Sequence, residues 1–146
     1  KILILKNIML ILENYIKFDL IEKYYENDDE KFLRQISKEV DIKMKALLSD
    51  YHNIQKKTFE DIINFHYQFE IIHPFQDGNG RVGRLIMFKE CLANNIVPFI
   101  IAEDLKLFYY RGLQEWTIIR EYLLDTCLSA QDNYKAILDY FEIEFE

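Results

Sequence analysis

Twelve consecutive residues, from His73 to Arg84, contain an imidazole, a carboxylate, three glycines and two arginines. An imidazole is the side chain best suited to accept a proton near neutral pH, which makes His73 a candidate general base. Asp77 stands where a hard cation that bridges phosphates would need an oxygen ligand. Arg81 and Arg84 are three residues apart, so on a helix they share a side and can clamp phosphate oxygens. The stretch therefore predicts a phosphate-binding site at which a proton is moved.

The glycines of this stretch suit a backbone that lies against a ligand. We expect Gly78 and Gly80 to adopt positive φ and to let a ligand come close to the main chain. The helix that follows would offer its free N–H groups and the positive end of its dipole to an anion. A plain loop, held by an Asp–Arg ion pair and a capping Asn, is the alternative. The coincidence of so many phosphate-compatible features in one turn favours the binding site.

The same glycines also match the G-x-G-x-x-G fingerprint of dinucleotide-binding proteins, and Glu103 and Asp104 follow roughly 20 residues later. That fingerprint requires a preceding β-strand within a βαβ unit. Residues 65–72 have the apolar spacing of a helix, and no alternating strand pattern follows. We therefore reject a dinucleotide-binding fold, and no P-loop is present.

The rest of the chain must position this loop, and it contains little that would interrupt a helix. There are four glycines and two prolines in all, so we expect long helices with short connections and an all-α fold. Apolar spacing predicts helices over residues 2–18, 30–49, 59–72, 80–93, 104–116, 117–129 and 131–142. Thr58 is the expected N-cap of the 59–72 helix, with Asp61 completing a capping box. The loop would then connect two core helices.

Several residues outside the loop have structural explanations. His66 lies on an apolar helix face, seven residues before His73, and is expected to be a hydrogen-bonded core histidine that supports the loop. We expect His52 in an exposed loop, Trp116 in the core, and the acidic residues 26–30 in a solvated loop.

Composition narrows the class of protein. A length of 146 residues fits one domain, and a net charge of -7 argues against a general nucleic-acid binder, although a small basic cluster can still hold phosphates.

Cys91 and Cys127 are far apart, which fits unpaired thiols in a cytoplasmic protein. The longest apolar run near the start, Ile8 to Leu12, is too short to span a bilayer, so no membrane partner is expected. Because the chain begins at Lys1, we expect a fragment of a longer protein.

Residues 73–84 resemble the motif of the Fic family, H-P-F-x-D/E-G-N-G-R-x-x-R, at every fixed position. A looser resemblance covers residues from about 43 to 141, which would be the core of a single Fic domain over residues 1–146. It implies a compact helical bundle with the active-site loop between two core helices. It also implies a nucleotidyltransferase that uses Mg²⁺ and ATP to place AMP on a protein, possible targets including the chain itself.

The resemblance assigns a role to each residue of the motif. His73 would be the general base for the target hydroxyl, and Asp77 would hold Mg²⁺ between phosphates. Phe75 would point inward and anchor the loop in the core. The α- and β-phosphates would bind mostly to main-chain N–H groups of Gly78, Asn79 and Gly80. Arg81 would support these phosphates, and Arg84 would reach the γ-phosphate.

The helix that contains Tyr109, Tyr110 and Leu113 resembles the one that lines the base pocket in this family. Both tyrosines occupy helical positions, so at least one is expected in the core. The other is a candidate for stacking on adenine.

The resemblance leaves the donor open. A kinase branch of the family has a lysine in this loop, and residues 73–84 contain none, which disfavours a kinase. Transfer of UMP or phosphocholine, or a non-catalytic interaction module, are the remaining alternatives.

Two family features have no clear counterpart. The nearest copy of the inhibitory helix S/T-x-x-x-E-G/N is Thr117 to Glu121, but Tyr122 follows where Gly or Asn is expected. Any inhibitory segment is therefore expected in a missing N-terminal segment or on a partner protein. Residues 19–41 also show no pattern of the target-docking hairpin, or flap.

Overall fold

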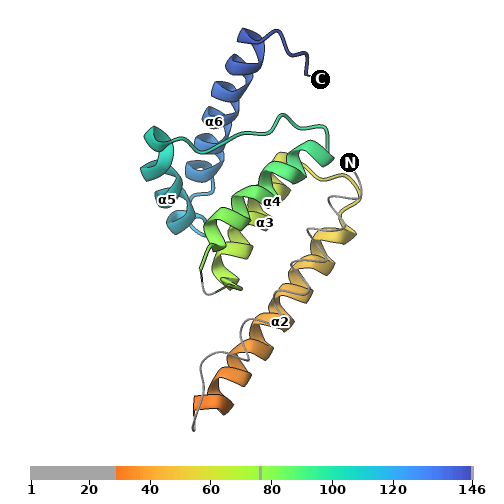
Figure 1. The fold of residues 1–146 in the computed structure, drawn as a ribbon, viewed down its shortest axis with the longest axis vertical. Coiled ribbons are helices and arrows are strands. Elements are labelled where there is room, and N and C mark those ends of the chain that lie inside the picture. Colours follow the sequence, from red (N-terminus) through yellow and green to blue (C-terminus); the bar gives the residue numbers. More distant parts are fainter. Residues whose placement is uncertain (1–28, 76, 146) are drawn as a thin grey trace.

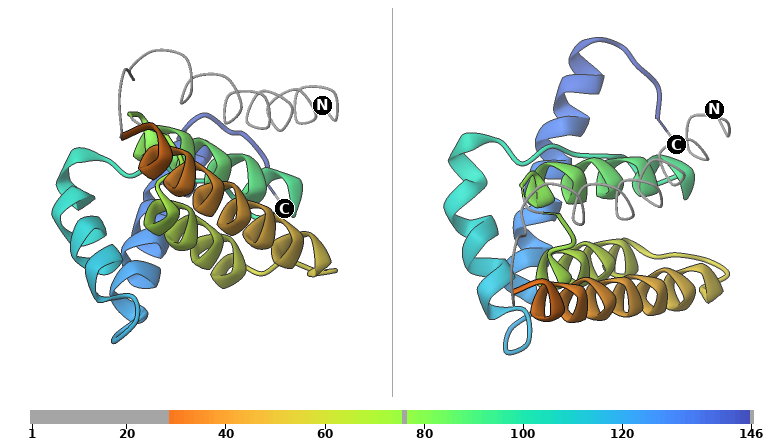
Figure 2. Two further views of the ribbon diagram at one scale, coloured as in Figure 1. Left: turned by 90° about the horizontal axis from the view of Figure 1, so that it is seen from below. Right: turned by 60° about the horizontal axis from the view of Figure 1, so that its bottom comes forward.

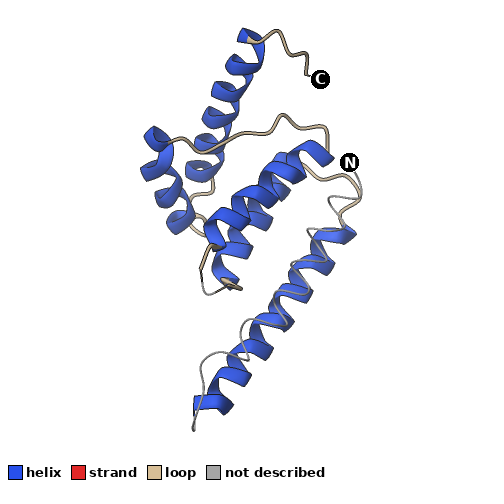
Figure 3. Cartoon of the chain, in the orientation of Figure 1, coloured by secondary structure: helices blue, strands red, loops and turns tan. Residues whose placement is uncertain are grey.

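The computed structural model describes residues 29–75 and 77–145, and every regular element in these ranges is helical (Figures 1 and 3). The elements are α2 (Asp29–Asn53), α3 (Phe59–Ile72), α4 (Asn79–Ala93), the 3-10 helix η1 (Glu103–Leu105), α5 (Lys106–Glu115) and α6 (Glu121–Tyr140). The expected all-α fold is confirmed. The segment before Gly78 contains helix α3 and no strand, which agrees with rejecting the dinucleotide-binding fold. The helix predicted over residues 2–18 lies outside the described residues.

Helix α3 is the central element, because its two faces belong to two different apolar clusters. On one face Ile62 and Ile63, both fully buried, join a cluster that also contains Met87, Trp116 and Leu123. On the other face Phe65 and Phe69 pack with Met44 and Ile86. Helices α3 and α4 therefore lie side by side, with α2 against α3 and with α5 and α6 on the far side (Figures 1 and 2). Each such side chain contributes about 1.5–3 kcal/mol when fully buried.

The capping box predicted at the start of α3 is confirmed. The Asp61 N–H donates to the Thr58 hydroxyl at 3.2 Å, and the Thr58 N–H donates to the Asp61 carboxylate at 2.8 Å. This reciprocal pair satisfies two N–H groups that the first turn of a helix leaves without main-chain partners. The start of α3 is thereby fixed in sequence, and so is the position of His73 one residue after its end.

The prediction of two helices over residues 117–129 and 131–142 is wrong, since one helix, α6, runs from Glu121 to Tyr140. Leu123, Cys127 and Ala130 form one continuous buried stripe along it, and no glycine or proline interrupts the sequence. The chain turns earlier, where the N–H groups of Ile118 and Ile119 both donate to the Glu115 carbonyl. The β-branched residues at 117–119 have low helix propensity, which explains a break at that place.

Smaller differences concern helix ends. Helix α2 continues to Asn53, so His52 is exposed in its last turn and not in a loop. Asp104 lies inside η1, and α5 begins only at Lys106. Trp116 is 2% exposed, which confirms its assignment to the core.

Candidate active site

Asn79 fixes the turn between α3 and α4 through its side chain. Its amide nitrogen donates to the Phe75 carbonyl at 2.5 Å, and its amide oxygen accepts from the Phe75 N–H at 2.8 Å. Asn79 is 2% exposed, and the Phe75 ring packs against Phe69 with centroids 6.1 Å apart. Phe75 therefore anchors the loop in the core, as expected. Because the Asn79 amide is occupied, what this residue can offer a ligand is its main-chain N–H.

His73 occupies the left-handed conformation that ends α3, with φ 52° and ψ 60°. Its N–H still donates to the Phe69 carbonyl at 3.0 Å, so the helix hydrogen bonding continues up to this residue. For a residue with a Cβ this conformation is unfavourable by roughly 1–2 kcal/mol, and the surrounding packing must offset that strain. The imidazole is exposed, and its Nδ1 lies 3.3 Å from the Glu70 carbonyl oxygen.

Gly78 is the N-cap of α4 and has φ 83°, as its sequence position predicted. The expectation of positive φ at Gly80 is wrong, because Gly80 already belongs to α4. The first intrahelical bond runs from the Val82 N–H to the Gly78 carbonyl at 2.9 Å. The N–H groups of residues 79–81 precede that bond and, like those of any first helical turn, are free for an anion.

Asp77 and Arg81 form an exposed ion pair at the mouth of the site. The Arg81 Nη2 lies 3.0 Å from the Asp77 Oδ2, and the two side chains are 74% and 91% exposed. The other carboxylate oxygen of Asp77 accepts from the Gly78 N–H at 2.6 Å. Exposed pairs of this kind contribute only about 0–1 kcal/mol, so phosphate or a cation can displace this one.

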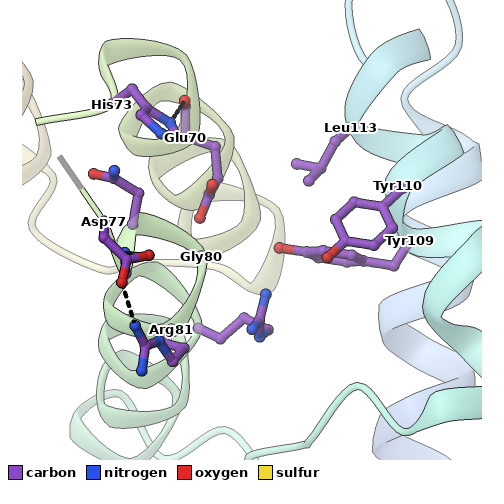
Figure 4. A pocket seen from close by; sticks show the side chains of 11 residues that line it. Glu70, His73, Asp77, Gly80, Arg81, Tyr109, Tyr110 and Leu113 are labelled. Atoms are coloured by element: carbon purple, nitrogen blue, oxygen red, sulfur yellow. Dashed lines mark hydrogen bonds and ion pairs between the residues drawn. The ribbon is translucent and has the colours of Figure 1, made fainter. Parts of the chain in front are cut away.

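All nine residues predicted for the site line one cavity of about 320 Å³ (Figure 4). Helix α3 contributes Glu70 and the capping His73 on one side. Helix α5 contributes Tyr109, Tyr110 and Leu113 on the other. The turn and the start of α4 supply the residues between them, Asp77, Gly78, Asn79, Gly80, Arg81 and Arg84.

Arg84 folds back along α4 toward the start of that helix. A Cβ atom at Gly80 would lie 3.0 Å from the Arg84 Nη1, which shows how close the guanidinium comes to the first turn. Its central carbon is 5.9 Å from the centre of the Tyr109 ring. Both arginines therefore line the cavity, Arg81 from the solvent side and Arg84 from the side of α5.

The two tyrosines divide as expected into one buried and one partly exposed residue. Tyr109 is 1% exposed, whereas Tyr110 is 46% exposed, and their rings meet edge to face at 5.4 Å. Tyr109 thus belongs to the core while still forming part of the cavity wall. Tyr110 is the one whose ring remains available to a ligand, and its stacking on a base stays a prediction.

Glu70 lines the cavity, although no role was expected for it from the sequence. Its side chain is 16% exposed, and its Oε1 is buried without a hydrogen-bond partner. Burial raises the pKa of this carboxyl, against the opposing charges of Arg84 and His73. The available signal was its spacing, because a residue three positions before His73 lies on the same side of a helix.

Other expected features have weaker structural counterparts. Thr117 and Glu121, the nearest match to an inhibitory helix, are both exposed, and Thr117 lies in the turn before α6. Of the segment searched for a flap, the described residues 29–41 belong to α2. Across residues 38–75 and 77–145, whose side chains the structure describes, no three His, Cys, Asp or Glu side chains gather into a potential metal site. No described helix is both long and apolar enough to cross a membrane.

Comparison with known proteins identifies a family and several relatives of this chain. The model of the Fic/DOC family matches residues 14–91, over half of the chain. Protein adenylyltransferase fic-1 of Caenorhabditis elegans is 35% identical over 66 residues, which are 45% of this chain and 13% of that protein. Protein adenylyltransferase Fic of Aedes aegypti is 43% identical over 49 residues, 34% of this chain and 10% of that protein.

The chain therefore spans only about a tenth of the length of these relatives, each match covering 10–13% of the relative. The family match nevertheless includes the whole turn from His73 to Arg84, the segment that builds most of the cavity. On this evidence the chain belongs to the Fic/DOC family.

Proposed function

We propose that this chain is a protein adenylyltransferase, which moves AMP from Mg-ATP to a Ser, Thr or Tyr hydroxyl of a protein and releases pyrophosphate. The observation that carries the proposal is the composition of one cavity, in which an imidazole, a helix N-terminus, two guanidinium groups and a carboxylate meet. The names of the relatives support the same reaction. The acceptor is either the chain itself or another protein.

The phosphates of ATP bind at the start of α4. The free N–H groups of the first turn and the positive end of the helix dipole stabilise negative charge there. Arg81 and Arg84 add two guanidinium groups, each able to hold phosphate oxygens with paired hydrogen bonds. Transfer of a phosphoryl-type group depends mainly on such positioning and charge neutralisation, so these groups supply most of the catalysis.

Asp77 is suited to hold the Mg²⁺ ion. Its carboxylate is 91% exposed, and among the described residues it contacts Arg81 and the neighbouring Gly78 N–H, so an oxygen can be released to a cation. Magnesium ions at phosphate sites use one or two carboxylates and take their other ligands from phosphate and water, so a larger acidic cluster is not required. The bound ion would neutralise charge on the phosphates of the donor.

His73 accepts the proton of the acceptor hydroxyl. A carbonyl oxygen can only accept, so Nδ1 is the donor in the contact with the Glu70 carbonyl, and in the neutral ring the lone pair is then on Nε2. The hydroxyl oxygen attacks the α-phosphorus as its proton passes to Nε2. The new O–P bond forms as the bond from the α-phosphorus to the bridging oxygen breaks, and pyrophosphate leaves with that oxygen.

Tyr110 and Leu113 receive the nucleotide base. They lie on α5, across the cavity from the phosphate-binding turn, and the Tyr110 ring is partly exposed (Figure 4). An exposed aromatic ring beside an aliphatic side chain offers a flat apolar surface on which a base can stack.

Intact-mass spectrometry of the full chain after incubation with Mg²⁺ and ATP tests the proposal. We expect one added AMP on the wild type and none on His73→Ala, with both variants binding ATP. Excess UTP or CDP-choline should leave the labelling unchanged, because the proposed donor is ATP. Equal labelling of His73→Ala would contradict the assignment of the base, and suppression by another donor would contradict the assignment of ATP.

A further inference from the structure

A buried hydrogen bond joins α3 to α5 directly behind the cavity. The His66 Nε2 lies 2.5 Å from the Tyr109 hydroxyl, and each residue is 1% exposed. The two residues are 43 positions apart in the chain, and neither belongs to the phosphate-binding turn. A short hydrogen bond that is buried away from water holds its two groups in one geometry. Breaking it would leave a buried polar group without a partner, which costs free energy.

The protonation states of the pair follow from its environment. Burial, assisted by the charge of Arg84, lowers the pKa of His66 to about 4, so its ring is neutral at neutral pH. Burial raises the pKa of Tyr109, so its hydroxyl keeps its proton. The bond therefore joins two neutral groups at neutral pH.

The same histidine also meets α4, one residue before Arg84. A Cβ atom at Gly83 would lie 2.9 Å from the His66 ring and 2.6 Å from the Glu70 Oε1, so only glycine allows α4 to approach α3 this closely. His66 thus touches α4 through Gly83 and α5 through Tyr109. The Arg84 guanidinium lies beside the Tyr109 ring, with its central carbon 5.9 Å from the ring centre.

We infer that His66 and Tyr109 are positioning residues, which hold the Arg84 guanidinium at the terminal phosphate of a nucleotide and so favour nucleoside triphosphates over diphosphates. The inference rests on the proposed function and on the family resemblance, which implies that Arg84 reaches the γ-phosphate. An arginine side chain loses much rotamer freedom when it binds, and a surface that orders it beforehand reduces that loss. The Tyr109 ring supplies that surface, and His66 fixes the ring.

The experiment measures the ratio of the dissociation constants of Mg-ADP and Mg-ATP by calorimetry on the full chain. The wild type should prefer ATP by about tenfold or more, the range expected of a charge-assisted contact to one phosphate. Arg84→Ala should remove the preference. Tyr109→Phe, which keeps the ring and loses the hydroxyl, should reduce the preference by about two- to fivefold, the value of one neutral hydrogen bond.

Three further variants separate positioning of Arg84 from a general loss of stability. In the Arg84→Ala background, Tyr109→Phe should change the ratio no further, because Tyr109 acts only through Arg84. Tyr51→Phe is the matched control, since Tyr51 donates to the buried Glu90 at 2.9 Å and does not line the cavity. It should lower stability in a similar way and leave the ratio at the wild-type value. His66→Phe, a second disruption of the same bond, should reproduce the ratio of Tyr109→Phe.

The outcomes distinguish the inference from the proposed function. If Tyr109→Phe weakened ATP and ADP binding equally, the inference would be overturned. It would also be overturned if Tyr109→Phe changed the ratio of dissociation constants further in the Arg84→Ala background. Neither result would affect the proposed AMP transfer. A wild-type preference that follows the expected pattern without any AMP transfer would support the inference and overturn the proposed function. A wild type that binds neither nucleotide would overturn both.

Discussion

The turn from residue 73 to 84 and the wall formed by α3 and α5 line the same cavity but differ in burial and in the strength of their contacts. In the turn, Asp77 and Arg81 make an ion pair that is largely exposed. In the wall, His66 and Tyr109 share a hydrogen bond that is almost completely buried. The Asp77–Arg81 pair can therefore be replaced by contacts with a ligand, whereas the buried bond between His66 and Tyr109 cannot. Groups that act on the ligand are concentrated in the turn, and the groups that hold them are in the wall.

Asp77→Ala should have the largest effect on activity and one of the smallest on stability. Loss of the metal-binding carboxylate should reduce AMP transfer by about 100-fold or more, as expected when a charge-stabilising group is removed. The midpoint of thermal unfolding should change little, because the side chain is 91% exposed. Parallel measurements of transfer and of thermal unfolding check both. A large fall in the unfolding temperature would show that the turn also supports the fold, and the contrast with the wall would be lost.

Gly83→Ala should have its main effect on stability, in contrast to Asp77→Ala. The new Cβ would meet the Glu70 Oε1 at 2.6 Å and the His66 ring at 2.9 Å, so α3 and α4 must separate. We expect a loss of about 1–3 kcal/mol in the free energy of unfolding, the range for overpacked cores, measured by urea denaturation.

Gly80→Ala provides the control on the same helix. Its Cβ would meet only the flexible end of Arg84, at 3.0 Å, so stability should be kept while ATP binding weakens. Equal losses of stability in the two variants would show that the close contact at Gly83 has no special importance.

The pH dependence of stability should reveal the buried His66. Its folded pKa of about 4 is below its ordinary value of 6.5, so between these values the unfolded chain binds more protons. The free energy of unfolding should therefore fall as the pH drops from 6.5 toward 4, by about 3 kcal/mol from this residue. Glu70, whose pKa is raised, contributes a slope of opposite sign in the range above its ordinary value.

The comparison of wild type with His66→Phe isolates the histidine, because Glu70 and Arg84 are present in both. Denaturation series between pH 4 and 7 should give a shallower dependence for the variant. Identical slopes would mean that folding does not lower the pKa of His66.

Arg81→Gln should have the smallest effect on the fold. It breaks an ion pair whose side chains are 74% and 91% exposed, so the free energy of unfolding should change by less than about 0.5 kcal/mol. Calorimetry should still detect weaker ATP binding, since one of the two guanidinium groups is lost. A loss of stability comparable to that of Gly83→Ala would place Arg81 among the supporting residues.

The sequence predicted the turn better than the wall for a physical reason. The motif, the capping box at Thr58 and the 59–72 helix depend on residues close together in the chain, where spacing carries the information. The bond from His66 to Tyr109 joins residues 43 positions apart, and no local pattern encodes it. The single helix α6 was not predicted, although its buried stripe continues through Ala130. Glu70 was missed because its carboxylate enters the cavity only once α3 and α4 are packed together.

The central claim is that the cavity directs attack to the α-phosphorus of ATP with His73 as the base. Incubating the full chain with Mg²⁺ and ATP labelled at either the α- or the γ-phosphate tests it most directly. We expect label from the α-phosphate to become attached to protein, label from the γ-phosphate to leave with pyrophosphate, and His73→Ala to transfer neither. Protein labelled from the γ-phosphate, or α-label transferred equally by His73→Ala, would contradict it.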